Sequence, residues 1–241
     1  MIDEIGILKD LLRMNSQAKE ALTEHWQNEI GISPARWGTT TTGTGAVARS
    51  VADPPYLKVV LTGTTNADTA RLYGIQRWLC APDEDDANYL KEAIIRATYL
   101  EFEAKFDTVA SILNTAFFMG FGDTQAVTEG SNNIVGFALD ASDDLIAVCN
   151  DGTGPTVSAA IQTTAQIANW HKYRIEVKLP EEINFYVDGE HQASIVASLP
   201  NYAMFPNWYL PQEAGANGAE LHVGSIRTWF DYVLREASRV G

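Results

Sequence analysis

Glu101 and Glu103 stand two residues apart in an alternating stretch, so their carboxylates share one face of a predicted strand. Paired carboxyl groups can cleave a glycosidic bond when one is protonated and the other is ionised. Charges at alternate positions are equally typical of the solvated face of a sheet. The sequence favours this second interpretation, and we predict no catalytic residues.

The histidines and the acidic turns show no spacing that would hold a zinc ion. The histidines are isolated from one another along the chain: His25, His171, His191 and His222. Acidic residues gather at 83–86 and at Asp140, Asp143 and Asp144, where clustered carboxylates can attract calcium. Solvated acidic loops explain these clusters as well. We therefore predict no metal and no cofactor, with calcium as the open alternative.

Residues 201–211 form the stretch richest in aromatic side chains, and we predict a loop there. Its aromatic residues are candidates for ligand or interface contacts: Tyr202, Phe205, Trp208 and Tyr209. Aromatic rings can stack on the apolar faces of sugars, and they also anchor protein interfaces. The favoured interpretation is a hydrophobic loop that packs over the domain or against another subunit.

The charge of the chain limits its partners. The 31 acidic and 17 basic residues give a formal net charge of -14, which repels the phosphates of nucleic acids. The chain has neither an apolar stretch of the length that a membrane span needs nor an N-terminal secretory pattern. Cys80 and Cys149 have apolar neighbours and are expected to be buried thiols, although the sequence leaves their pairing open.

The elements that position these residues begin with a short N-terminal segment. Residues 1–30 carry apolar side chains at helical spacing, which predicts a docking or oligomerisation segment built on Ile5, Leu8, Leu12, Leu22 and Trp26. Residues 31–55 are rich in threonine and glycine, and we expect a linker or a first strand.

Residues 56–241 have the two-residue period of β-strands. One stretch places Leu100, Phe102, Ala104 and Phe106 on one face and Tyr99, Glu101, Glu103 and Lys105 on the other. Another stretch directs Tyr173, Ile175 and Val177 inward. Short alternating strands separated by turn residues predict two antiparallel sheets, each covered on one side only.

Three segments resemble the concanavalin-type jelly roll of laminin-G-like domains, legume lectins and phage structural proteins: residues 99–123, NWHKYRIEVKLPEEINFYVDGEHQASI (169–195) and LHVGSIRTWFDYVL (221–234). The resemblance implies a mainly β, two-sheet jelly-roll sandwich at 56–241. Residues 101–106 are similar only superficially to the Glu-x-Asp-x-x-Glu motif of jelly-roll glucanases, because Glu103 replaces the aspartate and Phe106 replaces the last glutamate.

The resemblance, the N-terminal segment and the missing catalytic motifs lead us to expect a non-enzymatic assembly protein of a virus or phage particle. It would be a capsid decoration, head-fibre or tail-associated module at the virion surface, assembled in the host cytoplasm and otherwise soluble. The expected partners are capsid or other particle proteins and further copies of the chain, with glycans as an additional class. The alternative is a carbohydrate-binding module, and a glycoside-cleaving enzyme comes third.

Overall fold

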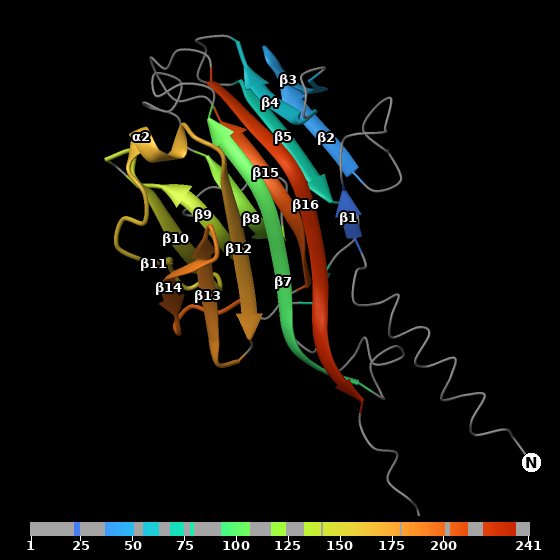
Figure 1. Ribbon diagram of the computed structural model, residues 1–241, viewed down its shortest axis with the longest axis vertical. Helices are drawn as coiled ribbons and strands as arrows, with labels where there is room; N and C mark the ends of the chain where they lie inside the picture. The colour runs from blue at the N-terminus through green and yellow to red at the C-terminus, as the bar shows by residue number, and fades with distance from the viewer. Residues whose placement is uncertain are drawn as a thin grey trace, which may run out of the picture.

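Two antiparallel β-sheets stacked face to face make up the described part of this chain (Figure 1). The computed structural model describes residues 22–24, 37–50, 55–62, 68–74, 78–79, 93–106, 117–123, 133–140, 142–178, 180–200, 203–211 and 219–234. The mainly β sandwich predicted from the alternation is therefore confirmed.

Sheet A has the strand order β14-β13-β12-β7-β16-β4-β3, and β1 also pairs with β16. Its strands are β1 (Leu22–Glu24), β3 (Gly45–Arg49), β4 (Leu57–Leu61), β7 (Ala93–Phe106), β12 (His171–Lys178), β13 (Glu182–Val187), β14 (Glu190–Ile195) and β16 (Ala219–Leu234). The long strands β7 and β16 lie side by side along the molecule (Figure 1).

Sheet B has the order β11-β10-β9-β8-β15-β5-β2, and β6 also pairs with β15. Its strands are β2 (Trp37–Thr42), β5 (Thr69–Gly74), β6 (Trp78–Leu79), β8 (Phe118–Gly122), β9 (Ile134–Leu139), β10 (Leu145–Asn150), β11 (Thr156–Val157) and β15 (Ala203–Pro211). One short helix, α2 (Thr164–Ile167), precedes β12. No helix in the described part of the chain has the length and apolarity that a membrane span requires.

The core lies between the two sheets and is rich in aromatic rings. Phe102 of sheet A lies 5.4 Å from the Trp208 ring of sheet B at an interplanar angle of 89° and 5.4 Å from the Tyr173 ring beside it. Cys149 is also fully buried here, whereas Cys80 lies outside the described residues. Burying large apolar side chains from both sheets supplies the main force that holds the layers together.

The predicted alternation in β7 and β12 is confirmed. Leu100, Phe102, Ala104 and Phe106 are at most 1% exposed, as are Tyr173 and Ile175. The residues between them point to the other side of sheet A. Because the side-chain period of a strand is two, the same register that buries these residues also fixes which charged residues face outward.

The predicted hairpin turn at Asp188-Gly189 joins β13 to β14. Asp188 and Gly189 have φ angles of 53° and 85°, the left-handed values that a two-residue hairpin of type I′ requires. The Asp188 carboxylate also accepts a hydrogen bond from the Lys172 amide at 2.9 Å and contacts His171 Nδ1 at 2.6 Å. The turn is thereby tied to the start of β12.

Two segments differ from the sequence predictions. Residues 203–211, which we predicted to be a loop, form β15 between β8 and β5. Leu22–Glu24 forms β1, paired with Ile226–Thr228, in a segment predicted to be helical. The antiparallel partner strand satisfies the backbone groups of β1 in place of helical hydrogen bonds.

The remaining predicted segments are covered only in part. Of the docking residues, Ile5, Leu8, Leu12 and Trp26 lie outside the described residues. Between 31 and 55 the described residues form β2 and β3, one in each sheet. The division of the chain at 30 and 55 stays a prediction.

Candidate functional site

The outward side of sheet A carries rows of charged and aromatic side chains that cross β13, β12, β7 and β16, and we call this surface the ladder face. In one row the register places Glu101 between Arg174 and Arg227. In the next, Glu103 pairs with Lys172, whose Nζ also lies 3.7 Å from Glu101 Oε1. Pairs of opposite charge on neighbouring strands stabilise a sheet, so these rows contribute to the pairing of β12, β7 and β16.

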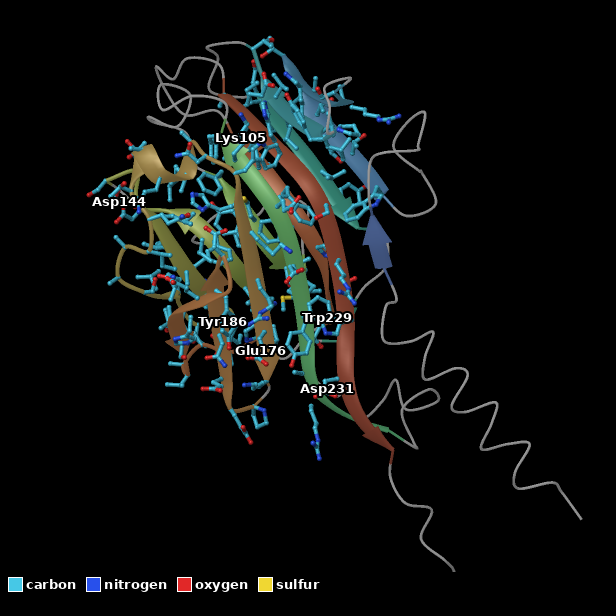
Figure 2. The ribbon with its side chains drawn as sticks, viewed as in Figure 1. Lys105, Asp144, Glu176, Tyr186, Trp229 and Asp231 are labelled. Carbon is cyan, nitrogen blue, oxygen red and sulfur yellow. The ribbon has the colours of Figure 1, made fainter. Side chains whose placement is uncertain are left out.

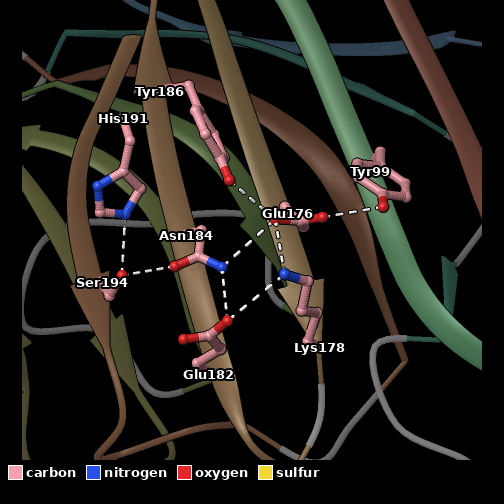
Figure 3. Close-up of polar contacts among 8 residues, drawn as sticks. All are labelled: Tyr99, Glu176, Lys178, Glu182, Asn184, Tyr186, His191 and Ser194. Atoms are coloured by element: carbon pink, nitrogen blue, oxygen red, sulfur yellow. Dashed lines mark hydrogen bonds and ion pairs between the residues drawn. The ribbon is translucent and has the colours of Figure 1, made fainter. Parts of the chain in front are cut away.

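A buried carboxylate, Glu176 on β12, is the centre of one part of this face (Figure 3). Its Oε1 accepts a hydrogen bond from the Tyr99 hydroxyl at 2.9 Å. Its Oε2 accepts from the Tyr186 hydroxyl at 3.0 Å and from Asn184 Nδ2 at 3.3 Å, and lies 3.1 Å from Lys178 Nζ. Three adjacent strands are thus linked through a single carboxylate.

A second carboxylate, Glu182, shares the partners of Glu176. Glu182 Oε1 accepts from Asn184 Nδ2 at 2.9 Å and lies 3.4 Å from Lys178 Nζ (Figure 3). Burial opposes ionisation of Glu176, but hydrogen bonds from Tyr99, Lys178 and Tyr186 outweigh it and hold the pKa of Glu176 below its ordinary value. The Asn184 hydrogen bond and Lys178 likewise lower the pKa of Glu182. The partners on β7, β12 and β13 therefore stabilise the ionised form of both carboxyl groups.

Aromatic rings flank Glu176 and stack with guanidinium groups. The rings of Tyr99 and Trp229 are parallel within 4° at a centroid distance of 4.8 Å. Arg174 Cζ lies 4.0 Å from the Tyr186 ring centre, and Arg227 Cζ lies 4.9 Å from that of Trp229. Figure 2 shows Tyr186 and Glu176 on the neighbouring strands β13 and β12 and Trp229 on β16, on the other side of β7, with Lys105 farther along the ladder face.

Trp170, just before β12, lies at the other end of the ladder face and is 42% exposed. Its ring meets the edge of the Tyr56 ring at a centroid distance of 5.6 Å and an angle of 71°. Lys105 Nζ is 5.8 Å from the centre of the indole. We call Trp170, Tyr56, Lys105 and His222 the Trp170 cluster.

His222 forms the floor of this cluster and is 2% exposed. It stacks on Tyr56 at 4.3 Å, and its Nε2 lies 2.5 Å from Glu220 Oε1, which also pairs with Lys58. Burial lowers the pKa of His222, and Glu220 only partly offsets that effect. Burial also disfavours the Glu220 carboxylate, but Lys58 and His222 outweigh it and lower the pKa of Glu220.

The aromatic residues predicted at 201–211 separate onto the two sides of β15. Trp208 is 0% exposed in the core, so it offers no ring face to a ligand. Phe205 and Tyr209 point to the outer side of sheet B but are only 9% and 8% exposed. Tyr202 lies outside the described residues. Phe205 and Tyr209 thus lie on the opposite side of β15 from Trp208, and the role of these candidates as ligand or interface contacts stays a prediction.

Arg71 of β5 lies on that outer side of sheet B, with 1% of its surface exposed. Its Nε donates to Asn207 Oδ1 at 3.0 Å, and its Cζ lies 4.2 Å from the Tyr73 ring centre. Burial lowers the pKa of Arg71 to about 10, despite the opposing influence of Tyr73 and Tyr209. The guanidinium remains charged at neutral pH, held by an amide and by ring faces.

The neighbouring strands of sheet B present apolar side chains on the same outer side. The members of this second apolar cluster are Phe118, Ile134, Ala138, Ile146, Val148 and Tyr209. The outward residues of β9 are Ile134, Gly136 and Ala138, so this strand presents no carboxylate.

Within the described strands, two carboxylates at successive outward positions occur on β7, as Glu101 and Glu103.

The other predicted site residues are placed without forming a metal centre. Phe106, at the position where the glucanase motif has a carboxylate, points into the core and is 1% exposed. Asp140 Oδ1 accepts the amides of Ser142 and Asp144 at 2.8 and 3.0 Å, so it caps the β9–β10 turn. Within the described ranges, no three His, Cys, Asp or Glu side chains are grouped as metal ligands.

Solved structures of several glycoside-cleaving enzymes share this arrangement of strands. A glycosyl hydrolase family 16 protein from Mycobacterium smegmatis is 13% identical with a TM-score of 0.61, covering 87% of this chain and 100% of its own. The Bacillus licheniformis beta-glucanase is 13% identical with a TM-score of 0.56, covering 86% and 97%. A structure described with endo-acting O-glycanases of the human gut microbiota is 11% identical with a TM-score of 0.61, covering 88% and 99%. No family model and no curated protein matches the chain.

The fold is the concanavalin-type jelly roll. At these identities the likeness establishes the sandwich alone. It nevertheless corrects the expectation of a non-enzymatic viral or phage particle protein, because the sandwich is shared along nearly its whole length with enzymes that cleave glycosides. The comparisons give no support to a capsid, head fibre or tail, and that expectation is wrong.

Sequence reasoning missed the Glu176 network and the Trp170 cluster. The alternation in β12 and β13 places Glu176 and Tyr186 outward, which is a usable signal, but it gives no indication that Tyr99 of β7 reaches the same carboxylate. The pairing of β7 with β12 joins residues 77 positions apart, and a single sequence contains no direct record of that pairing.

Proposed function

We propose that this protein cleaves a glycosidic bond in a carbohydrate polymer. The observation that carries the proposal is the length of the shared sandwich: the likeness covers 86–88% of this chain and 97–100% of the three enzymes named above. A fold that hosts many functions does not fix the reaction by itself, so the chemistry must come from side chains.

Glu101 and Glu103 are the candidate reacting carboxyl groups. They leave β7 on the same side, and a strand rises about 3.4 Å per residue, so their Cβ atoms are about 7 Å apart. That spacing admits a water molecule between the two carboxyl groups, as direct attack by water with inversion at the sugar carbon requires. Glu101 is surrounded by Lys172, Arg174 and Arg227, and Glu103 lies beside the exposed indole of Trp170.

The reaction would break the C–O bond to the leaving sugar and form a C–O bond to water. One carboxyl group would donate a proton to the leaving oxygen, and the other would accept a proton from the attacking water. The two groups would exchange protonation states and recover them through solvent. The Glu176–Glu182 pair is assigned no part in this exchange, because Tyr99, Tyr186, Asn184 and Lys178 already occupy its carboxylate oxygens.

The test is the release of reducing ends from a β-glucan and from mucin glycans, because the similar structures include a β-glucanase and one described with O-glycanases that initiate mucin breakdown. We expect Glu103→Gln to lower the rate by about 100-fold or more, as loss of an acid–base group does. Glu190→Gln, an exposed glutamate on β14, is the matched control and should leave the rate unchanged. Full activity in both Glu101→Gln and Glu103→Gln would contradict the assignment of these carboxyl groups.

A further inference from the structure

We infer that the exposed indole of Trp170 is a stacking site for an uncharged sugar ring, on the outer side of sheet A. This inference rests on the proposed function for the class of ligand. Its location rests on the geometry of the Trp170 cluster.

Trp170 differs from the other described tryptophans in its exposure. Trp37 and Trp208 are 2% and 0% exposed in the core, and Trp229 is half-buried against Tyr99 on the ladder face, whereas Trp170 is 42% exposed. The other exposed large apolar side chains of the described residues are Val157 and Val196, which are aliphatic. An aromatic surface left open to water in a sandwich that buries comparable rings is a candidate contact for a ligand.

A glycine in β16 provides the surface on which the indole rests. The register of β16 against β7 shifts between Val223 and Ile226, and Gly224 lies in that irregularity. A Cβ atom at Gly224 would lie 3.4 Å from Trp170 Cζ3 and 3.0 Å from both Cβ and Oε2 of Glu103. The missing side chain of Gly224 leaves room for Glu103, and the indole lies next to the same glycine, so the indole and the Glu103 side chain meet over this point of β16.

The neighbours of Trp170 hold the ring and supply polar groups around it. Tyr56 meets it edge to face, and His222 lies beneath at a centroid distance of 6.2 Å. Glu103 and Lys105 stand two residues apart on the same side of β7, next to the indole. An aromatic face bordered by a carboxylate and an ammonium group matches a sugar ring, which has apolar C–H groups on its faces and hydroxyls at its edge.

The charges around the site favour an uncharged glycan over an acidic one. Near Trp170, Lys58 pairs with Glu220 and Lys172 with Glu101, and the Lys105 ammonium group stands on the same side of β7 as the Glu103 carboxylate, two residues away. The whole chain carries a formal net charge of -14 and repels polyanions. Polymers of uronic acids or sulfated sugars would therefore bind less favourably than neutral hexose chains.

The test is calorimetric titration of the full chain with a soluble β-1,3-gluco-oligosaccharide and with a uronic-acid oligosaccharide of equal length. We expect Trp170→Ala to weaken binding of the neutral probe at least tenfold, and Trp170→Tyr to retain most of it. Val157→Ala, which alters a side chain of similar exposure on sheet B, is the control and should bind as the wild type does. The indole N–H signal that disappears from the NMR spectrum of Trp170→Ala should shift when the neutral probe is added to the wild type.

Each outcome separates the stacking site from the hydrolysis. Reducing-end release together with equal binding by wild type and Trp170→Ala would overturn the stacking site and leave the hydrolysis standing. Trp170-dependent binding without reducing-end release would support the stacking site and contradict the hydrolysis. Tighter binding of the uronic-acid probe, or no binding of either probe by the wild type, would also overturn the stacking site.

Discussion

Glu176 joins three strands through its two carboxylate oxygens, with Tyr99 from β7 and Asn184 and Tyr186 from β13 as its donors. Such a group stabilises the sheet only while all of its partners are in place, because a buried polar atom left without one carries the full cost of desolvation. The outward side of sheet A is thus held by specific polar contacts in addition to the apolar core.

Replacing Glu176 by glutamine should lower the free energy of unfolding by about 1–3 kcal/mol, because hydrogen bonds to a charged group are lost or weakened. Urea unfolding at pH 7 measures this change. Glu190→Gln, an exposed control on the neighbouring edge strand, should change it by less than about 0.5 kcal/mol. Equal stability of the two variants would show that the Glu176 network contributes nothing to folding.

The same network predicts how stability depends on pH. The pKa values of Glu176, Glu182, Asp188 and Glu220 are all lower in the folded chain than their ordinary values. The folded state therefore binds fewer protons than the unfolded state, so the contribution of these groups is complete above about pH 5 and is lost as the pH falls below about 4. Urea midpoints measured at decreasing pH should fall in that range, and less steeply in Glu176→Gln than in the wild type.

On sheet B, Asn207→Leu should cost about 2 kcal/mol of unfolding free energy, because Arg71 Nε loses its acceptor while the guanidinium stays buried. Arg71→Met in the Asn207→Leu background should restore part of the loss, since an apolar pair leaves no buried charge. Thermal or urea unfolding of the three proteins is the measurement. A double variant less stable than Asn207→Leu would show that the charge of Arg71 stabilises the chain through other contacts.

At the scale of the elements, period-two alternation predicted β7, β12 and the β13–β14 hairpin, because one buried face leaves a direct record in the sequence. It failed at β15, where Pro206 lacks an amide proton and is typical of loops or edge strands. Pro206 nevertheless lies in a strand paired on both sides, opposite Phe121 of β8. Burial of Met204, Trp208 and Leu210 in the core outweighs that local preference.

The β13–β14 hairpin gives a direct test of the element assignments. Gly189 has a φ of 85°, which side chains with a Cβ disfavour, so Gly189→Ala should destabilise the chain by about 1 kcal/mol or more. Urea unfolding measures the change, with Glu190→Ala in the adjoining strand as the control. Unchanged stability in Gly189→Ala would contradict the left-handed turn.

For the whole molecule, the sequence was sufficient to predict a two-sheet sandwich but not its activity. The resemblance was specific for the sandwich, and it led to a particle protein because the same fold serves many functions. The candidate site could be predicted only in part. The sequence shows Glu101 and Glu103 as a same-face pair. The place of Trp170 beside Glu103 and Gly224 depends on the pairing of β7 with β16, which the sequence does not show.

The central claim, that this sandwich hydrolyses a glycosidic bond, is tested most directly by incubating the full chain with a neutral glucan in water enriched in heavy oxygen and weighing the products by mass spectrometry. Hydrolysis predicts shorter chains with one heavy oxygen for each bond cleaved, located at the new reducing end, and the loss of these products in Glu103→Gln but not in Glu190→Gln. Intact polymer, or shortened chains that carry a double bond and no heavy oxygen, would contradict the account.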